Sequence, residues 1–205
     1  MVPEYWSVAS AELSALDSQM ASLVATYEGE ILRSRGTPFA TLARSIVGQQ
    51  ISVKASESIW SRVLGRCGEV TPERFCSLGT LGLSGCGLSQ RKIEYLLDLA
   101  MHFQAGRLNP LGWTEMEDEA LIKALCEVRG IGRWTAEMFL IFNQLRQDIF
   151  PLDDIGLQRA VSVHYFSGKQ LSRKELADFG QRWRPWRTVA TWYLWRSLDP
   201  LPVAY

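Results

Sequence analysis

Val128-Arg-Gly-Ile-Gly-Arg-Trp-Thr-Ala136 is the stretch that decides the fold, and Phe150-Pro-Leu-Asp-Asp154 follows it along the chain. Gly130 and Gly132 flank Ile131, and glycine tolerates positive φ and close backbone approach. We expect Ile131 to anchor in the core while the backbone amides after it point outward. Free N–H groups at the start of a helix, aided by the helix dipole, bind anions such as phosphate.

Amphipathic patterns on both sides of this turn predict a helix, a short hairpin and a second helix. Upstream, Thr114-Glu-Met-Glu117 has the pattern of a capping box, and apolar residues at helical spacing continue to Val128. Downstream, Ala136, Phe139 and Leu140 continue the next helix. The sequence therefore predicts a helix-hairpin-helix over residues 114–146.

The rest of the chain predicts an all-α fold. Its 205 residues are 47% hydrophobic, enough for one large domain or two small helical lobes. Every strong apolar period is helical, and no stretch alternates with the period of two that a strand requires. We find no internal repeat and no low-complexity segment.

Local signals place several helix boundaries. The pattern predicts one first helix over residues 11–27, a helix break at Gln49-Gln50, and loops with short turns over residues 79–87. Predicted helix starts are Thr71-Pro72, Ser89, the capping box Ser172-Arg-Lys-Glu175, and Pro185.

Composition limits the cofactor and the compartment. The cysteines Cys67, Cys76, Cys86 and Cys126 fit neither a zinc pattern nor a dense disulfide framework, which favours reduced thiols in a cytoplasmic protein. His102 and His164 have no second ligand at metal spacing. The N-terminus has no signal-peptide pattern, and no segment approaches a membrane span. We expect a cytoplasmic protein, nucleoid-associated if bacterial, with no membrane partner.

Charge is unevenly distributed although the net charge is zero. Residues 129–196 hold eleven Lys or Arg against six Asp or Glu, whereas residues 1–36 are mildly acidic. This modest basic excess suits a protein that must scan DNA and release it. The same charges could equally serve to solvate helix faces.

An acid pair stands at the start of a predicted helix. Asp153 and Asp154 follow Pro151, and apolar residues at helical spacing come after them. One of the two acids is expected to be the N-cap, where orphan amides and the helix dipole favour an ionised carboxylate. Such a pair is more often a simple cap than a catalytic group.

Four segments in order resemble one family, the 3-methyladenine DNA glycosylase II branch of the helix-hairpin-helix base-excision glycosylases. These are Ala43–Val53, the hairpin segment Leu125–Ala136, Pro-Leu-Asp-Asp, and Trp183–Trp195, so the resemblance covers roughly residues 35 to 198. Some relatives carry an extra N-terminal β-rich domain, for which this chain is too short. No cysteine follows Cys126, so the iron–sulfur loop of the endonuclease III branch is missing.

The resemblance implies two helical lobes with an active-site cleft between them. One lobe would hold approximately residues 36–110 with the helix-hairpin-helix 114–146, and the other residues 1–35 with 153–205. Asp154 matches the catalytic aspartate because Arg159 follows it by five residues, as the family pattern requires, and the spacing back to Trp134 agrees. A carboxylate there stabilises an oxocarbenium-like transition state or orients water. Asp153 would then be structural.

The resemblance also suggests the substrate. Trp134 and Trp195 match positions that line the base pocket, and Met138 replaces an aromatic residue of one relative. Indole faces attract cationic rings such as 3-methyladenine and 7-methylguanine. Trp134 also stands where bifunctional relatives have their lysine nucleophile, so we predict hydrolysis that leaves an abasic site, without lyase activity. Trp183 and Trp186 are expected to pack between the lobes.

The expected partner is double-stranded DNA containing a damaged base, bound by a monomer. Gln50 matches the wedge that fills the hole left by a flipped nucleotide, although a polar helix end explains it equally well. No cofactor is required, but relatives bind a monovalent cation through backbone carbonyls that match Cys126, Val128 and Ile131. The expected DNA contacts are Gly130, Gly132, Arg133, Thr135, Gln49 and Gln50.

Two other functions remain open on the sequence alone. One is a glycosylase for neutral bases, whether deaminated, etheno-modified or oxidised, which would need hydrogen-bonding groups in its pocket. The other is a non-catalytic helix-hairpin-helix module that binds DNA, with Asp154 kept only as a cap.

Overall fold

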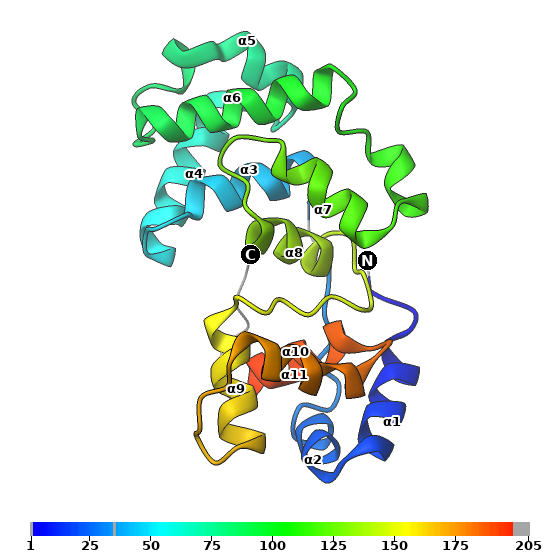
Figure 1. The fold of residues 1–205 in the computed structure, drawn as a ribbon. Helices are drawn as coiled ribbons and strands as arrows, with labels where there is room; N and C mark the ends of the chain where they lie inside the picture. The colour runs from blue at the N-terminus through cyan, green and yellow to red at the C-terminus, as the bar shows by residue number, and fades with distance from the viewer. Residues whose placement is uncertain (1, 35, 199–205) are drawn as a thin grey trace. The chain divides into compact units, whose positions relative to one another are not determined.

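The computed structural model describes residues 2–34 and 36–198, and these residues form helices with no strand (Figure 1). The predicted all-α class is confirmed. The chain divides into two compact units, residues 1–34 with 140–204, and residues 35–139. The division falls inside helix α8 (Arg133–Phe142), so the end of the predicted segment 114–146 belongs to the first unit. Residues 1, 35 and 199–205 of the predicted lobes lie outside the described residues.

Side-chain caps begin four α-helices of the unit 35–139. The hydroxyls of Thr37, Ser52, Thr71 and Ser89 each accept a hydrogen bond from a backbone amide three residues on, which satisfies one of the orphan donors of a helix start. The predicted starts at Thr71 and Ser89 are thereby confirmed. The helices are α3 (Pro38–Gly48), α4 (Val53–Cys67), α5 (Pro72–Leu83), α6 (Gln90–Gln104), η1 (Pro110–Glu115) and α7 (Asp118–Cys126).

The core of this unit is built on α6, which packs against both α3 and α5 (Figure 1). Edge-to-face aromatic contacts run through the core, with ring centroids 5.2 to 6.1 Å apart. The rings belong to Phe39, Phe75, Phe103, Trp113 and Phe139. This packing fixes α6 as the element against which the others are placed.

The N-terminal segment forms two helices, α1 (Trp6–Leu16) and α2 (Ser18–Thr26), so the prediction of a single helix over residues 11–27 is wrong. Asp17 separates them because its backbone is extended and its carboxylate accepts from the Met20 amide at 2.7 Å. The same carboxylate accepts from the Tyr165 hydroxyl at 3.1 Å. Burial, together with the adjacent Asp17 charge, raises the pKa of Tyr165.

The first unit also holds α9 (Ile155–Tyr165), α10 (Arg173–Gly180), η2 (Gln181–Trp183) and α11 (Arg187–Leu198). The capping box predicted at Ser172 is present. Trp183 is fully buried against the rings of Phe150, Tyr165 and Phe179 in this unit's own core. Trp186 stacks on Tyr5 of the same unit. Both indoles therefore have partners within the unit, where the sequence placed them between lobes.

Three predicted boundaries differ from the structure. Thr114 lies inside η1, and α7 begins at Asp118 after Glu117, which makes no side-chain cap, so the capping box at Thr114 is wrong. Helix α5 continues to Leu83 across a kink at Gly79, into the region predicted as loops. The last helix begins at Arg187, two residues after Pro185.

Two further observations bear on membranes and metals. None of the helices within the described residues is both long and apolar enough to cross a bilayer. Across the same residues there is no group of three or more His, Cys, Asp or Glu side chains that could hold a metal ion. All four cysteines are free.

Candidate active site

Asp154 is the N-cap of α9, as the acid pair predicted. Its side chain is buried, and Oδ1 accepts a hydrogen bond from the Leu157 amide at 2.6 Å. The same oxygen accepts from the indole Nε1 of Trp195 at 2.8 Å. A backbone donor and a side-chain donor therefore converge on one carboxylate oxygen at the positive end of a helix dipole, an arrangement that favours negative charge.

Trp195 comes from α11 and is held on two sides. Its ring stacks on Phe142 with centroids 5.8 Å apart and planes 11° from parallel. Gly156 lies beside the indole, and a Cβ there would stand 3.3 Å from Cδ1 of Trp195 and 3.1 Å from Oδ1 of Asp154. The missing side chain at position 156 therefore leaves room for the contact between indole and carboxylate.

Residues 146–150, the segment that leads to Asp154, are tied to the start of α11. Asp148 binds the guanidinium of Arg187 through both carboxylate oxygens, at 2.6 and 2.9 Å. Thr188 is fully buried; its hydroxyl donates to the Arg146 carbonyl at 2.5 Å and accepts from the Ile149 amide at 2.9 Å. These bonds hold the segment that leads to Asp154 against the start of α11, the helix that carries Trp195.

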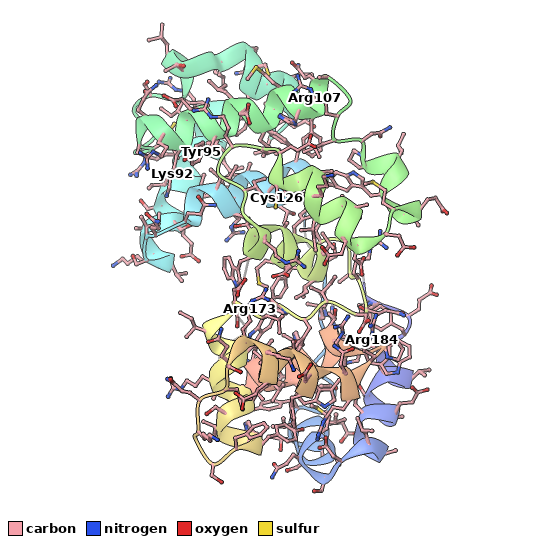
Figure 2. The ribbon with its side chains drawn as sticks, in the orientation of Figure 1. Lys92, Tyr95, Arg107, Cys126, Arg173 and Arg184 are labelled. Atoms are coloured by element: carbon pink, nitrogen blue, oxygen red, sulfur yellow. The ribbon has the colours of Figure 1, made fainter. Side chains whose placement is uncertain are left out.

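Asp153 has a different environment from its neighbour. Its carboxylate is exposed and pairs with Arg173 Nε at 3.0 Å. Arg173 is labelled near the start of α10 in Figure 2. The structure thus gives Asp153 a surface ion pair and Asp154 a buried cap, and the catalytic role of Asp154 stays a prediction.

The hairpin lies in the other unit, between α7 and α8. Ile131 is buried, as predicted, and its amide donates to the Val128 carbonyl at 3.1 Å. Gly130 adopts φ +87°, a conformation that L side chains rarely take. The ring of Tyr95 lies directly against it: a Cβ at position 130 would stand 2.1 Å from Cδ2 of Tyr95. Gly130 is therefore required both by its backbone and by its neighbour.

The first residues of α8 divide between surface and core. The Arg133 guanidinium binds Glu119 of α7 at 2.5 and 2.9 Å and Glu137 at 2.9 Å, so its side chain joins the two helices of the motif. These carboxylates, Glu119 first, raise the pKa of Arg133. Trp134 is 37% exposed, whereas Thr135 and Met138 are buried.

The predicted wedge lies in a tight turn. Helix α3 ends at Gly48, so the predicted helix break is confirmed, and Gln50 is exposed with φ +57°. Gln49 Nε2 donates to the Gly130 carbonyl at 2.8 Å. The structure therefore brings the turn and the hairpin into contact within one unit, which the sequence did not indicate.

The carbonyls of Cys126, Val128 and Ile131 lie around the end of α7 and the hairpin, where the dipole of α7 favours a cation. The Val128 oxygen already accepts from the Ile131 amide, and its second lone pair can still face an ion. Each of these residues supplies the carbonyl oxygen that such a cation takes. The monovalent cation stays a prediction.

Two residues beside Trp195 were not predicted. Phe142 is one apolar residue in a helical stripe, and its stacking on Trp195 joins positions far apart in the sequence. Gly156 carries the only available signal, since a glycine in the first turn of a helix is unfavourable unless a neighbour needs the space.

The sequence is similar to proteins of one repair superfamily. The model of the HhH-GPD superfamily of base excision DNA repair proteins matches residues 43–185. The chain belongs to this superfamily. DNA-3-methyladenine glycosylase 1 of Schizosaccharomyces pombe is 31% identical over 196 residues, which cover 92% of this chain and 86% of that protein.

Two solved structures of this superfamily have a similar fold. The crystal structure of DNA-3-methyladenine glycosidase from Bacillus halodurans matches with a TM-score of 0.84 and 35% identity, over 92% of this chain and 88% of that one. The Schizosaccharomyces pombe 3-methyladenine DNA glycosylase in complex with abasic DNA matches with a TM-score of 0.80 and 29% identity, over 96% and 98%. The resemblance to the 3-methyladenine glycosylase branch is confirmed.

Proposed function

We propose that this chain is a monofunctional DNA glycosylase that flips out and excises alkylated purines in base excision repair. The observation that carries the proposal is the Asp154 carboxylate, buried at the start of α9 and held by the Leu157 amide and the Trp195 indole. Relatives named as 3-methyladenine glycosylases, one of them bound to abasic DNA, support the same reaction.

The chemistry follows from the charge that develops on the sugar. As the bond between C1′ and the base nitrogen breaks, positive charge builds on the sugar, and an ionised carboxylate nearby stabilises it. The carboxylate can also orient the attacking water. A carboxylate with two fixed donors does not reorganise during the reaction, which is the condition under which such stabilisation is largest.

The hairpin and the Gln49-Gln50 turn serve DNA binding in this proposal. The N-terminus of α8 offers backbone donors to a phosphate. Gln50 is exposed in its turn, and its amide can pair with the base left without a partner after flipping. Arg133 contributes chiefly by joining α7 to α8 through Glu119 and Glu137.

The substrate class follows from the aromatic residues. Trp134 and Trp195 offer electron-rich faces, which attract a base carrying positive charge more than a neutral one. An alkylated purine also has a weakened bond to the sugar, so it needs less catalytic power. A neutral base would require a hydrogen-bonding pocket, and Met138 supplies no such group.

A panel of duplexes tests this choice. Each duplex carries one lesion, either 7-methylguanine, 1,N6-ethenoadenine, hypoxanthine or 8-oxoguanine, and base release is measured under single-turnover conditions. We expect 7-methylguanine to be released at least about ten-fold faster than any neutral base, because of its charge. Faster release of hypoxanthine or 8-oxoguanine would favour the neutral-base glycosylase instead.

Trp134 predicts the form of the product. An indole cannot form a Schiff base, so the wild-type protein should leave abasic strands intact. Borohydride added during turnover should trap no covalent complex with DNA, and alkali should be needed to cut the product strand. A trapped complex would contradict the monofunctional assignment and would point to an amine elsewhere in the chain.

Trp195→Phe should lower the rate of excision about ten-fold, because it removes one donor to a charged carboxylate. Phenylalanine keeps a ring that can stack on Phe142, so binding of the substrate should change less than kcat. The measurement is the single-turnover rate constant at saturating protein, which is compared here as kcat, and Kd is determined separately. Trp192→Phe, which removes an indole of α11 that packs on Trp6, is the control and should leave kcat near the wild-type value. Equal losses in both variants would show that the Trp195 indole N–H has no special role.

A further inference from the structure

Lys92 of α6 binds the end of α3 with its ammonium group. Its Nζ donates to the Val47 carbonyl at 2.7 Å and to the Gln49 carbonyl at 2.8 Å. The last carbonyls of a helix lack intrahelical partners and carry the negative end of its dipole. The Lys92 side chain is half-buried, and desolvation lowers its pKa, so the two hydrogen bonds offset a real cost of burial.

The residue after these carbonyls is strained. Gln50 has φ +57°, in the left-handed region, and its side chain is exposed. A non-glycine residue keeps such a backbone only where the surrounding structure holds it. Lys92 binds the carbonyl of Gln49, the residue immediately before, and so restrains the turn at the point where the strain occurs.

The same helix also holds the hairpin. The Asp98 carboxylate of α6 accepts from the Arg129 amide at 2.8 Å, and the Tyr95 ring lies against Gly130. Figure 2 shows Lys92 and Tyr95 near one end of α6 and Arg107 near the other. The Gln49 side chain completes the connection by donating to the Gly130 carbonyl at 2.8 Å. Turn and hairpin are thus bound to one helix and to each other.

We propose that Lys92 is a positioning residue that, with the Gln49 amide, locks the Gln49-Gln50 turn to the hairpin. Gln50, which enters the duplex, and the backbone amides at the start of α8, which hold the phosphate, then act as one rigid body. Binding of the phosphate at the hairpin places Gln50 at a fixed distance along the same DNA. This inference rests on the proposed function, since it needs a DNA duplex from which a nucleotide is flipped.

If Lys92 served only to stabilise the protein, Lys92→Met would lower its stability and have no separate effect on flipping. Burial of the Lys92 charge costs free energy, and methionine removes this cost, which offsets part of the loss of the two hydrogen bonds. Lys92→Met should therefore fold, which circular dichroism and a thermal melt would confirm. Its defect should appear in flipping, through Gln50, and not in the stability of the protein.

A double-mutant cycle tests whether Lys92 acts through Gln50. The variants are Lys92→Met, Gln50→Ala and the two combined, and the readout is kcat/KM on a duplex with one 7-methylguanine. Each single variant should lose about ten-fold, and the double variant should lose no more than either, because both remove the same step. Independent effects would multiply to about a hundred-fold and would overturn the inference. Arg107→Met, which removes a charge at the far end of α6, should match the wild type.

A second readout does not depend on base excision. The duplex carries 2-aminopurine next to an abasic analogue, and its fluorescence rises when a side chain enters the stack. Wild-type protein should raise the signal, Lys92→Met should lose most of the rise at saturating protein, and Lys92→Arg, which can still donate to both carbonyls, should restore it. An unchanged signal in Lys92→Met would overturn the inference. If that variant does not fold, Gln49→Leu removes the link to Gly130 and takes its place in both tests.

The two proposals fail in different ways. A wild type that excises methylated purines, beside a Lys92→Met variant that excises equally well, contradicts only the role of Lys92. A wild type that raises the fluorescence but releases no base contradicts the glycosylase, while the loss of signal in Lys92→Met still supports the rigid connection. A wild type that does neither contradicts both.

Discussion

Asp154→Asn is expected to lower the rate of base excision by about a thousand-fold, the range seen when a fixed electrostatic group is removed from a transition state. Asparagine is as good an N-cap as aspartate, and its carbonyl oxygen can still accept from the Leu157 amide. The fold should therefore persist while the negative charge beside the sugar is lost. The measurement is single-turnover release of 7-methylguanine from a duplex.

The neighbouring acid provides the control for this variant. Asp153→Asn removes the same charge one residue away, at an exposed ion pair with Arg173, and such pairs contribute little. Its excision rate should stay within about two-fold of the wild type. Binding of Asp154→Asn to a duplex with an abasic site should also persist. Equal excision by Asp154→Asn and the wild type would contradict the catalytic role and leave Asp154 as a cap.

Gly130→Ala is expected to destabilise the protein by about 3 kcal/mol, because it adds backbone strain to a steric conflict. The backbone at this position has φ +87°, and the new Cβ would stand 2.1 Å from the Tyr95 ring, close to the root of that side chain. To relieve the conflict, the Tyr95 ring must rotate away from Gly130 or the hairpin must shift. The free energy of unfolding in urea is the measurement, and affinity for abasic duplex DNA should fall with it.

Two comparisons separate the backbone strain at position 130 from the steric conflict with the Tyr95 ring. Gly132→Ala places a Cβ with no atom within 4 Å, so its unfolding free energy should differ little from the wild type. Gly130→Ala in a Tyr95→Ala background should lose less than in the wild-type background, since only the backbone strain remains. A Gly130→Ala variant as stable as Gly132→Ala would show that the hairpin adapts, and would refute the required glycine.

Local chemistry explains which parts of the fold the sequence predicted. Caps act over three residues, so Thr71, Ser89, Asp154 and Ser172 were readable as helix starts. The same local rule misled at Thr114, because the chain there forms a 3-10 helix whose residues satisfy one another before α7 begins. A cap signal shows that a helix can start, and tertiary packing decides whether it does.

The sequence showed no sign of a helix start at Asp17, although α2 begins directly after it. Its apolar neighbours continue a helical period from residue 11 to residue 27, so periodicity alone predicted one helix. The carboxylate instead caps α2 and accepts from Tyr165, which comes from the other end of the chain. Nothing in the local sequence distinguishes an acid that breaks a helix from an acid on its surface.

The sequence predicted individual residues of the site, but it did not predict the hydrogen bonds and ion pairs that join them. Resemblance indicated Asp154 and Trp195 separately, but the hydrogen bond between them joins residues 41 positions apart and depends on the room left by Gly156. Likewise, the sequence did not indicate that the Arg133 guanidinium binds two carboxylates of the motif, while its contact with DNA stays a prediction. Such pairings arise from the fold, and one sequence gives no direct signal for them.

The most direct test of the central claim is the identity of the base that the wild-type protein releases from methylated duplex DNA. The supernatant is analysed by mass spectrometry, and abasic sites are counted on the recovered strands, with Asp154→Asn in parallel. We expect free 3-methyladenine and 7-methylguanine, an equal number of uncut abasic sites, and almost no release by the variant. No released base, despite tight binding to a duplex with an abasic site, would contradict the glycosylase and favour a DNA-binding module.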